Sequence, residues 1–248
     1  MTTLPTHTHH CHASDARQNQ LLATLSDLEW HRWRPHLEPV DLSLGQVLCE
    51  SGRNPPYVIF PTTAIVSLLY LTLNGASAEV AVVGNDGVVG LSVFMGGNAT
   101  PSQAVVQSSG QGYRLRAQLV KNEVARGGAV LHMLLRYTQA MIAQVAQTAV
   151  CNRFHSIDQQ LARRLLLALD RLPTDELEMT QELAANLLGV RREGVTAAAH
   201  KLQRAGVIRY NRGHIVVLDR HRLEQCTCEC YAVAKTEYDR LLPMPLAA

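Results

Sequence analysis

The spacing of apolar residues changes along the chain, and each change marks a different kind of element. Apolar residues recur at helical spacing between Leu21 and Trp30, and Pro35 ends that pattern. From residue 40 to residue 116, short runs of Val, Ile, Leu and Tyr alternate with turn sequences such as that at Asn74 and Gly75. Short strands separated by turns at this interval predict an antiparallel β-roll.

A long helix is predicted after Gly127 and Gly128, because turn residues then disappear for more than forty positions. Apolar and small residues recur in this stretch at alternating spacings of four and three, which is a heptad seam. The seam consists of Leu131, Leu135, Thr138, Ile142, Val145, Ala149 and Asn152. Such a seam suits a helix that meets a second copy of the chain. A helix buried within one chain would show the same spacing, so both interpretations stay open.

A helix-turn-helix is predicted in the C-terminal part. An amphipathic segment from Ser156 is stopped by Pro173, and a new helix begins after Thr180, a favourable N-cap. Gly189 ends that helix, and the next helix runs from about residue 191 to residue 205. Residues 207–210 and 214–218, joined by a turn, then predict a two-stranded wing.

These elements predict an α+β protein with four parts. They are a leader (1–17), an antiparallel β-roll (18–128), a dimerisation helix (129–155) and a winged helix-turn-helix domain (156–248). The leader is set apart because it is polar and lacks an apolar period.

Charge points to the partner of the C-terminal part. The whole chain carries only +2, from 23 basic and 21 acidic residues, but Gly189–Arg222 holds eight basic residues against Glu193 and Asp219. That local excess favours an anionic partner. No run approaches the ~20 apolar residues that span a bilayer, and the N-terminus lacks a signal-peptide pattern. We therefore expect a cytoplasmic protein without a membrane partner.

The second helix of the motif carries candidate groups for reading DNA bases. The N-terminal turn of such a helix enters the major groove, where Arg bonds guanine and Glu accepts a hydrogen bond from cytosine. The base-reading candidates are Arg191, Arg192, Glu193 and Thr196. The phosphate-binding candidates are Thr180, Lys201, Arg204, Arg209 and Arg212. A solvated helix pair would also expose arginines, but here a glycine turn, a wing and the local charge coincide, so we expect a duplex DNA operator as partner.

The combination of roll, long helix and winged domain resembles the cyclic-AMP receptor protein and fumarate-nitrate regulator (Crp/Fnr) family of bacterial transcription regulators. The most specific part is Gly189–Val195, similar to the family's Gly-x-(Ser/Thr)-Arg-Glu-Thr-Val recognition segment. The resemblance implies that Arg192 and Glu193 read bases. The next arginine of the family pattern falls on Ala197, so one base contact is missing.

The nucleotide pocket of that family is altered in this chain. A Gly-Glu-Leu segment there binds the ribose and an Arg-Ser-Ala segment clamps the cyclic phosphate, whereas this chain has Leu91 and then Ser102 or Gln103 at the two charged positions. A buried phosphate without a cationic partner costs on the order of several kcal/mol, so control by cyclic AMP is not expected. The alternative is that Arg53 or Arg114 reaches into the roll from elsewhere.

Cysteine and histidine give no firm metal site. Cys226 and Cys230 share one face of a predicted C-terminal helix and form a candidate pair for redox or metal sensing, or else are small buried hydrophobes. Cys228 points away from that face, so three thiolates cannot converge on a metal from a regular helix. The N-terminal cluster of His7, His9, His10, Cys11 and His12 lacks the four cysteines of an iron–sulfur centre. We therefore predict no metal and no cofactor.

No catalytic constellation or phosphate loop is recognisable in the sequence, so no enzyme is predicted. The expected function is a homodimeric transcription regulator that binds two half-sites of a near-palindromic DNA site, with RNA polymerase as a further candidate partner. The alternative is a signalling or ligand-binding module whose winged domain docks a protein.

Overall fold

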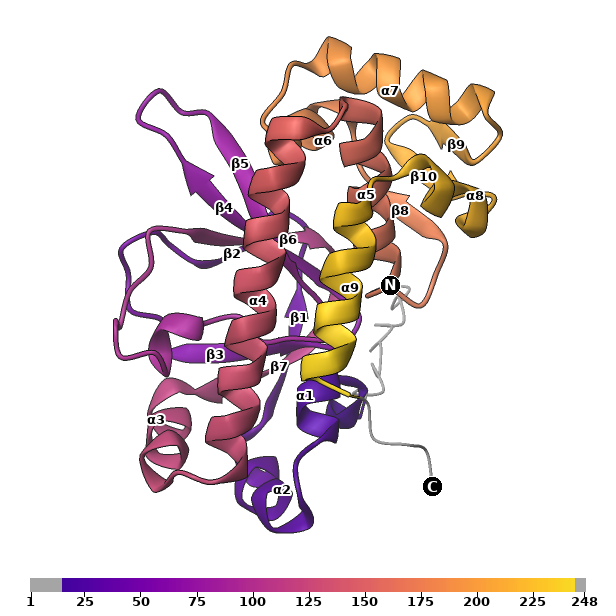
Figure 1. The fold of residues 1–248 in the computed structure, drawn as a ribbon. Coiled ribbons are helices and arrows are strands. Elements are labelled where there is room, and N and C mark those ends of the chain that lie inside the picture. Colours follow the sequence, from indigo (N-terminus) through magenta and orange to yellow (C-terminus); the bar gives the residue numbers. More distant parts are fainter. Residues whose placement is uncertain (1–14, 244–248) are drawn as a thin grey trace, which may run out of the picture.

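The computed structural model describes residues 15–243 (Figure 1). Its first helices pack against the roll through Leu21, Leu22 and Trp33 and through the buried side chain of Asn19. Helix α1 (Gln20–Ala23) is capped by Asn19, which accepts from Leu21 N at 3.1 Å. The amide of Asn19 also donates to the carbonyl oxygens of Pro61 (2.9 Å) and Gly87 (2.8 Å). Helix α2 (Asp27–Trp33) follows and begins with a capping box.

The predicted antiparallel β-roll is confirmed. It consists of two sheets of antiparallel strands with turns where the sequence predicts them. One sheet has the order β1 (Glu38–Leu42), β7 (Gly110–Arg116), β3 (Tyr57–Pro61). The other has the order β2 (Val47–Cys49), β6 (Gln103–Ser108), β4 (Ile65–Leu71), β5 (Ser77–Val83). Val58, Phe60 and Leu115 pack in the core between the sheets.

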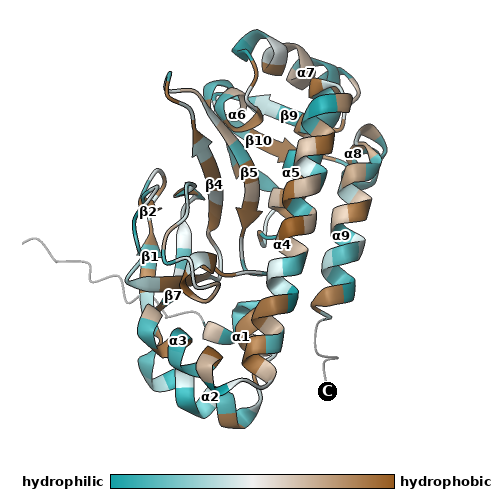
Figure 2. Cartoon of the chain, turned by 60° about the vertical axis from the view of Figure 1, so that its left-hand side comes forward, coloured by the Kyte–Doolittle hydropathy of each residue, from teal (hydrophilic) through white to brown (hydrophobic). Residues whose placement is uncertain are grey.

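The long helix is also present. Helix α3 (Ala117–Arg126) leads through two glycines to α4 (Ala129–Phe154), a helix of 26 residues. Helix α9 (Glu229–Leu241) lies beside α4 along much of its length and runs in the opposite direction (Figures 1 and 2).

The C-terminal part contains the predicted helix-turn-helix and wing. Its elements are α5 (Ile157–Leu169), β8 (Glu176–Glu178), α6 (Gln181–Leu188), α7 (Arg192–Arg204), β9 (Ile208–Asn211), β10 (His214–Val217) and α8 (Arg220–Cys226). The wing is one strand larger than predicted, because β8 pairs with β10. Strand β8 has only three residues, of which only Leu177 is apolar, so its sequence shows no alternation from which a strand could be predicted.

The expectation of one continuous C-terminal helix through the cysteines is wrong. Helix α8 ends at Cys226, and Thr227 and Cys228 are extended (ψ 179° and 170°) before α9 begins. The break turns α9 back along α4, and Leu241 and Leu242 become part of the core of the roll. Burial of these two leucines is a tertiary effect that the local sequence pattern does not contain.

Two buried ion pairs join the roll to the C-terminal part. Arg164 of α5 donates to Glu79 of β5 at 3.0 Å, and both side chains are almost fully buried. Ser67 and Gln107 complete this polar cluster. Arg171, just after α5, pairs with Asp86 at 2.7 Å. The winged domain is therefore held against the roll by charges as well as by apolar contacts.

Each member of the Arg164–Glu79 pair depends on the other. Burial raises the pKa of Glu79 and lowers the pKa of Arg164, so the interior disfavours both charges. Their mutual attraction opposes this effect. Removing one partner leaves the other as an unpaired buried charge, which is much more costly than removing both.

We expect Glu79→Gln to lower the free energy of unfolding by about 3–5 kcal/mol, the range measured when one partner of a buried pair is removed. Adding Arg164→Met should restore part of that loss, because no unpaired charge then remains. Denaturant unfolding of the two single variants and the double variant measures the coupling. Glu237→Gln, which removes the exposed pair with Arg240, is the control and should have little effect. Additive losses in the double variant would contradict the pairing.

Candidate nucleic-acid interface

The turn between α6 and α7 has the backbone that a helix-turn-helix needs. Thr180 caps α6 by accepting from Leu183 N at 3.1 Å, and Gly189 ends the helix in the left-handed conformation (φ 65°). Beyond the turn, Val195 and Leu202 bury the inner face of α7. The opposite face of α7 is therefore presented outward.

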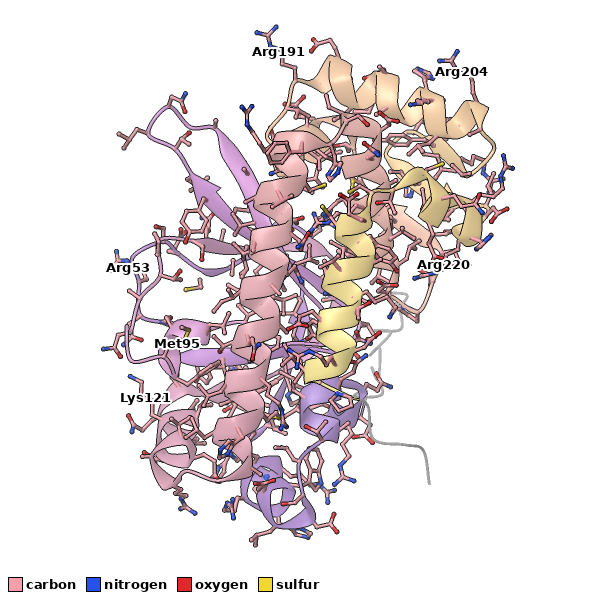
Figure 3. The ribbon with its side chains drawn as sticks, in the orientation of Figure 1. Arg53, Met95, Lys121, Arg191, Arg204 and Arg220 are labelled. Carbon is pink, nitrogen blue, oxygen red and sulfur yellow. The ribbon has the colours of Figure 1, made fainter. Side chains whose placement is uncertain are left out.

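The first turn of α7 is the most exposed part of this surface. Arg191, Arg192 and Glu193 are all exposed. Figure 3 shows Arg191 and Arg204 at the two ends of α7, both extending away from the body of the molecule. No carboxylate within residues 15–243 lies within 4.0 Å of the Arg191 or Arg192 guanidinium groups to neutralise them.

Thr196, one turn further along α7, is only half exposed. Its hydroxyl lies 2.8 Å from Gln181 Oε1 and 3.0 Å from the carbonyl oxygen of Arg192. It therefore links α7 to the first turn of α6. Its methyl group, rather than its hydroxyl, is left for a contact with a base.

The phosphate-binding candidates differ in their availability. Arg204, Arg209 and Arg212 are exposed and have no ion-pair partner in the described part of the chain. Lys201 differs from them, because its Nζ lies 2.5 Å from Asp158 Oδ2 of α5. The hydroxyl of Thr180 already serves as the cap of α6.

A hollow of about 530 Å³ lies between α6, α7 and the wing. Its walls include Thr180 and Gln181 at the start of α6, Arg192 of α7, and Arg212 at the tip of the wing. Amide groups at a helix N-terminus and arginine side chains both favour phosphate oxygens. The hollow thus joins a base-reading candidate to two phosphate-binding candidates.

The pocket of the roll is apolar. A cavity of about 440 Å³ is lined by both Leu91 and Ser102, the residues at the positions of the family's nucleotide-binding charges. No acidic, basic or histidine side chain lines it. Met141 and Val145 of α4 close one side.

Neither arginine that could replace the missing clamp reaches this cavity. Arg114 stacks over Tyr57 at 4.5 Å and pairs with Glu38 at 2.6 Å on the other sheet. Arg53 is exposed at the edge of the roll (Figure 3) and is not part of the lining.

The predicted seam of α4 is divided between the core and the surface. Leu135 and Ile142 are 54% and 62% exposed, and Val145 and Ala149 are also exposed. Thr138 is buried and Leu131 is half-buried. The exposed members form an apolar stripe along the side of α4 that its own chain leaves uncovered.

The structure rearranges the predicted cysteine pair. Cys226 packs at the edge of the C-terminal core, whereas Cys230 lies in a separate cluster with Cys151 and Cys228. The helix break at Thr227 is the physical reason. Cys151 and His155 were not predicted from the sequence. A cysteine and a histidine four positions apart at the end of a helix lie on one face, which is a recognisable pattern for metal ligands. The N-terminal His/Cys cluster lies outside the described residues.

Comparison with known proteins agrees with this geometry. Residues 159–226 match the Crp-like helix-turn-helix domain. FixK2 from Bradyrhizobium japonicum has the same fold, with 17% identity and a TM-score of 0.67 over 77% of this chain and 98% of that chain. So does a putative Crp/Fnr transcriptional regulator from Eubacterium rectale, with 19% identity and a TM-score of 0.66 over 85% and 98%. A search of curated proteins finds no sequence match.

The fold and the family match together define a winged helix-turn-helix protein. More specifically, the chain carries a Crp-like helix-turn-helix domain within the fold of the Crp/Fnr transcription regulators, and the resemblance drawn from its sequence is confirmed. Within residues 15–243, no helix is both long and apolar enough to cross a membrane.

Proposed function

We propose that the protein is a homodimeric, sequence-specific DNA-binding transcription regulator that cyclic AMP does not control. The observation that carries the proposal is the exposed first turn of α7, where Arg191, Arg192 and Glu193 stand unpaired beside a basic wing. The match of this segment to a Crp-like helix-turn-helix domain supports the same conclusion.

Base reading would be shared between two kinds of group. Arg192 can donate two hydrogen bonds to guanine O6 and N7, and Glu193 can accept one from cytosine N4. Arg204, Arg209 and Arg212 would bind phosphates on either side and fix the register of α7 in the groove. Ala197 adds no polar contact, so the specificity depends on few residues.

The exposed stripe of α4 supports dimerisation. Water-exposed Leu135 and Ile142 are spaced by one heptad, and Ala149 continues the row. A second copy packed on this stripe would bury these residues and place two α7 helices on one face. Two recognition helices then reach successive major grooves about 34 Å apart.

For base reading, we expect Arg192→Ala to weaken binding to the preferred site by about 1–3 kcal/mol and to relax base preference at one position in each half-site. Arg212→Ala should weaken all sequences alike, because a phosphate contact carries no sequence information. Selection of bound sequences from a random pool, followed by affinity measurements, separates the two effects. Arg126→Ala, an exposed arginine of α3, is the matched control. An unchanged preferred sequence for Arg192→Ala would refute its role.

The salt dependence of binding tests the class of partner. Neutralising several phosphates makes log K fall steeply with log salt, and Arg212→Ala should reduce the slope by about one. A winged domain that docks a protein would instead show no affinity for duplex DNA at any salt concentration. That result would contradict DNA binding and favour a winged domain that docks a protein.

For dimerisation, we expect Ile142→Glu to give a monomer, because a carboxylate in a tight apolar seam would lose its water. Analytical ultracentrifugation measures the change, and specific DNA affinity should fall with it. Leu73→Glu, at a fully exposed turn between β4 and β5, is the control and should leave the dimer intact. A dimer that persists in Ile142→Glu would place the interface elsewhere.

For the roll, we expect calorimetric titration with cyclic AMP or cyclic GMP to show no binding, and DNA affinity to stay unchanged. The cavity offers a cyclic phosphate no cationic side chain, and its lining favours an uncharged, mainly apolar molecule. A ligand shifts a conformational equilibrium only through different affinities for the two states. Micromolar binding of either nucleotide with a change in DNA affinity would overturn this part of the proposal.

A further inference from the structure

Four metal-ligating side chains converge where α4 meets α9. Cys151 lies in the last turn of α4 and His155 directly follows that helix, while Cys228 precedes α9 and Cys230 lies in its first turn. The three sulfur atoms and one imidazole nitrogen all lie within 4.8 Å of one another. Residues more than 70 positions apart are thus brought together by the antiparallel packing of the two helices.

We propose that Cys151, His155, Cys228 and Cys230 form a zinc site that fastens α9 to the end of α4. Zn²⁺ prefers four ligands in a tetrahedron, and three cysteines with one histidine are a common structural set. Zn–S bonds of about 2.3 Å place neighbouring ligand atoms about 3.8 Å apart. The observed Cys151–Cys228 Sγ distance and the Cys230 Sγ–His155 Nδ1 distance are both 3.5 Å, so small shifts are enough for binding.

The same distances favour a single ion over an iron–sulfur cluster. In a cluster, the four ligands are divided among two or more iron atoms, so they do not all surround one point. Here all four ligand atoms fit around one point. Soft thiolates with one imidazole also select zinc over the hard cations Mg²⁺ and Ca²⁺.

The surroundings of His155 support a metal ligand. Its Nδ1 faces Cys230, while its Nε2 lies 3.4 Å from Glu229 Oε1. Metal-bound histidines usually donate their other ring nitrogen to a carboxylate or carbonyl, which fixes the orientation of the ring. Gln160 of α5 donates to the carbonyl oxygen of His155 at 2.9 Å and so holds the backbone at the same point.

Burial and charge suit a closed structural site. The thiols of Cys151, Cys228 and Cys230 are buried, and His155 is only slightly exposed. Arg163 of α5 acts electrostatically on Cys151 and Cys230 and would offset the net negative charge of three thiolates, one imidazole and Zn²⁺. Burial and the neighbouring Cys228 thiol raise the pKa of Cys151 and of Cys230.

Cys151, Cys228 and Cys230 could serve only as small buried apolar side chains. That role would not explain why His155 and the carboxylate of Glu229 lie beside them. Cys49 shows how a cysteine without this role is placed, because it packs among apolar side chains in the core of the roll, and no other cysteine among residues 15–243 belongs to that core cluster. Cys226, close in sequence to the cluster, stays outside it. These two residues are therefore natural controls.

The test measures zinc in the full-length, untagged protein purified under reducing conditions. The His-rich N-terminus can hold metal independently, so the informative quantity is the difference between variants. We expect Cys151→Ser and Cys230→Ser each to contain one zinc less per chain than the wild type. Cys226→Ser and Cys49→Ser should retain the full amount. Equal zinc in all five proteins, or none in any, would refute the site.

Cobalt substitution adds a measurement on the wild-type protein, which does not depend on how the variants fold. In the wild type, Co²⁺ should give the d–d bands of tetrahedral coordination and charge-transfer bands of three thiolates. His155→Gln should keep the thiolate bands but change the d–d pattern. Octahedral spectra without thiolate bands would show binding at the histidine-rich terminus only and would overturn the proposal.

Metal removal provides a stability readout. Chelation should lower the Tm of the wild type, and added Zn²⁺ should restore it, because a ligand that binds only the folded state stabilises it. Cys151→Ser should not respond to either treatment. A Cys151–Cys228 disulfide that forms when the reductant is removed, with no response of the Tm to zinc, would instead identify a redox pair and overturn the proposal.

Discussion

The position of the DNA-binding surface depends on two arginines that cross from the C-terminal part into the roll. Arg164 and Arg171 are seven residues apart and bury their charges against Glu79 and Asp86. Moving the domain on the roll would separate these charges from their partners, and an unpaired buried charge is strongly destabilising. Few other positions of the domain on the roll are therefore stable. Helix α5, which is anchored in this way, packs against the inner face of α7. The start of α7 is therefore left exposed on the other side. A change in the roll that moved β5 would therefore move the recognition helix as well.

Much of the fold follows from local pattern. The strands of the roll, the start of α4 and the helix-turn-helix were predicted because each depends on the spacing of apolar residues and on a few turn residues such as Gly189. The exposed first turn of α7 could be predicted for the same reason, since the start of a helix after a glycine turn is readable from local spacing, whereas its base-reading role stays a prediction. The lack of charge in the pocket of the roll could also be predicted, because Leu91 and Ser102 are uncharged whatever their geometry.

Contacts between distant segments could not be predicted. The ion pair of Arg164 joins residues 85 positions apart, and a single sequence does not indicate which carboxylate an arginine will meet. The break at Thr227 was missed because the surrounding residues tolerate a helix, and only the burial of Leu241 and Leu242 favours the turn. As a result, the cysteines were assigned to one helical face, and Cys151 was not considered with them.

The return of α9 along α4 changes the topology of the DNA-binding part. Its chain enters from the end of α4 and leaves into the start of α9, and these two points lie side by side. The winged domain is thus a closed loop of about 77 residues inserted into a single antiparallel helix pair. Closing a loop removes conformational freedom from the unfolded segment, so the domain can open locally and refold without losing its place. Because both ends of the winged domain are attached at the same place, the domain cannot swing away from the roll as a domain on a single linker could.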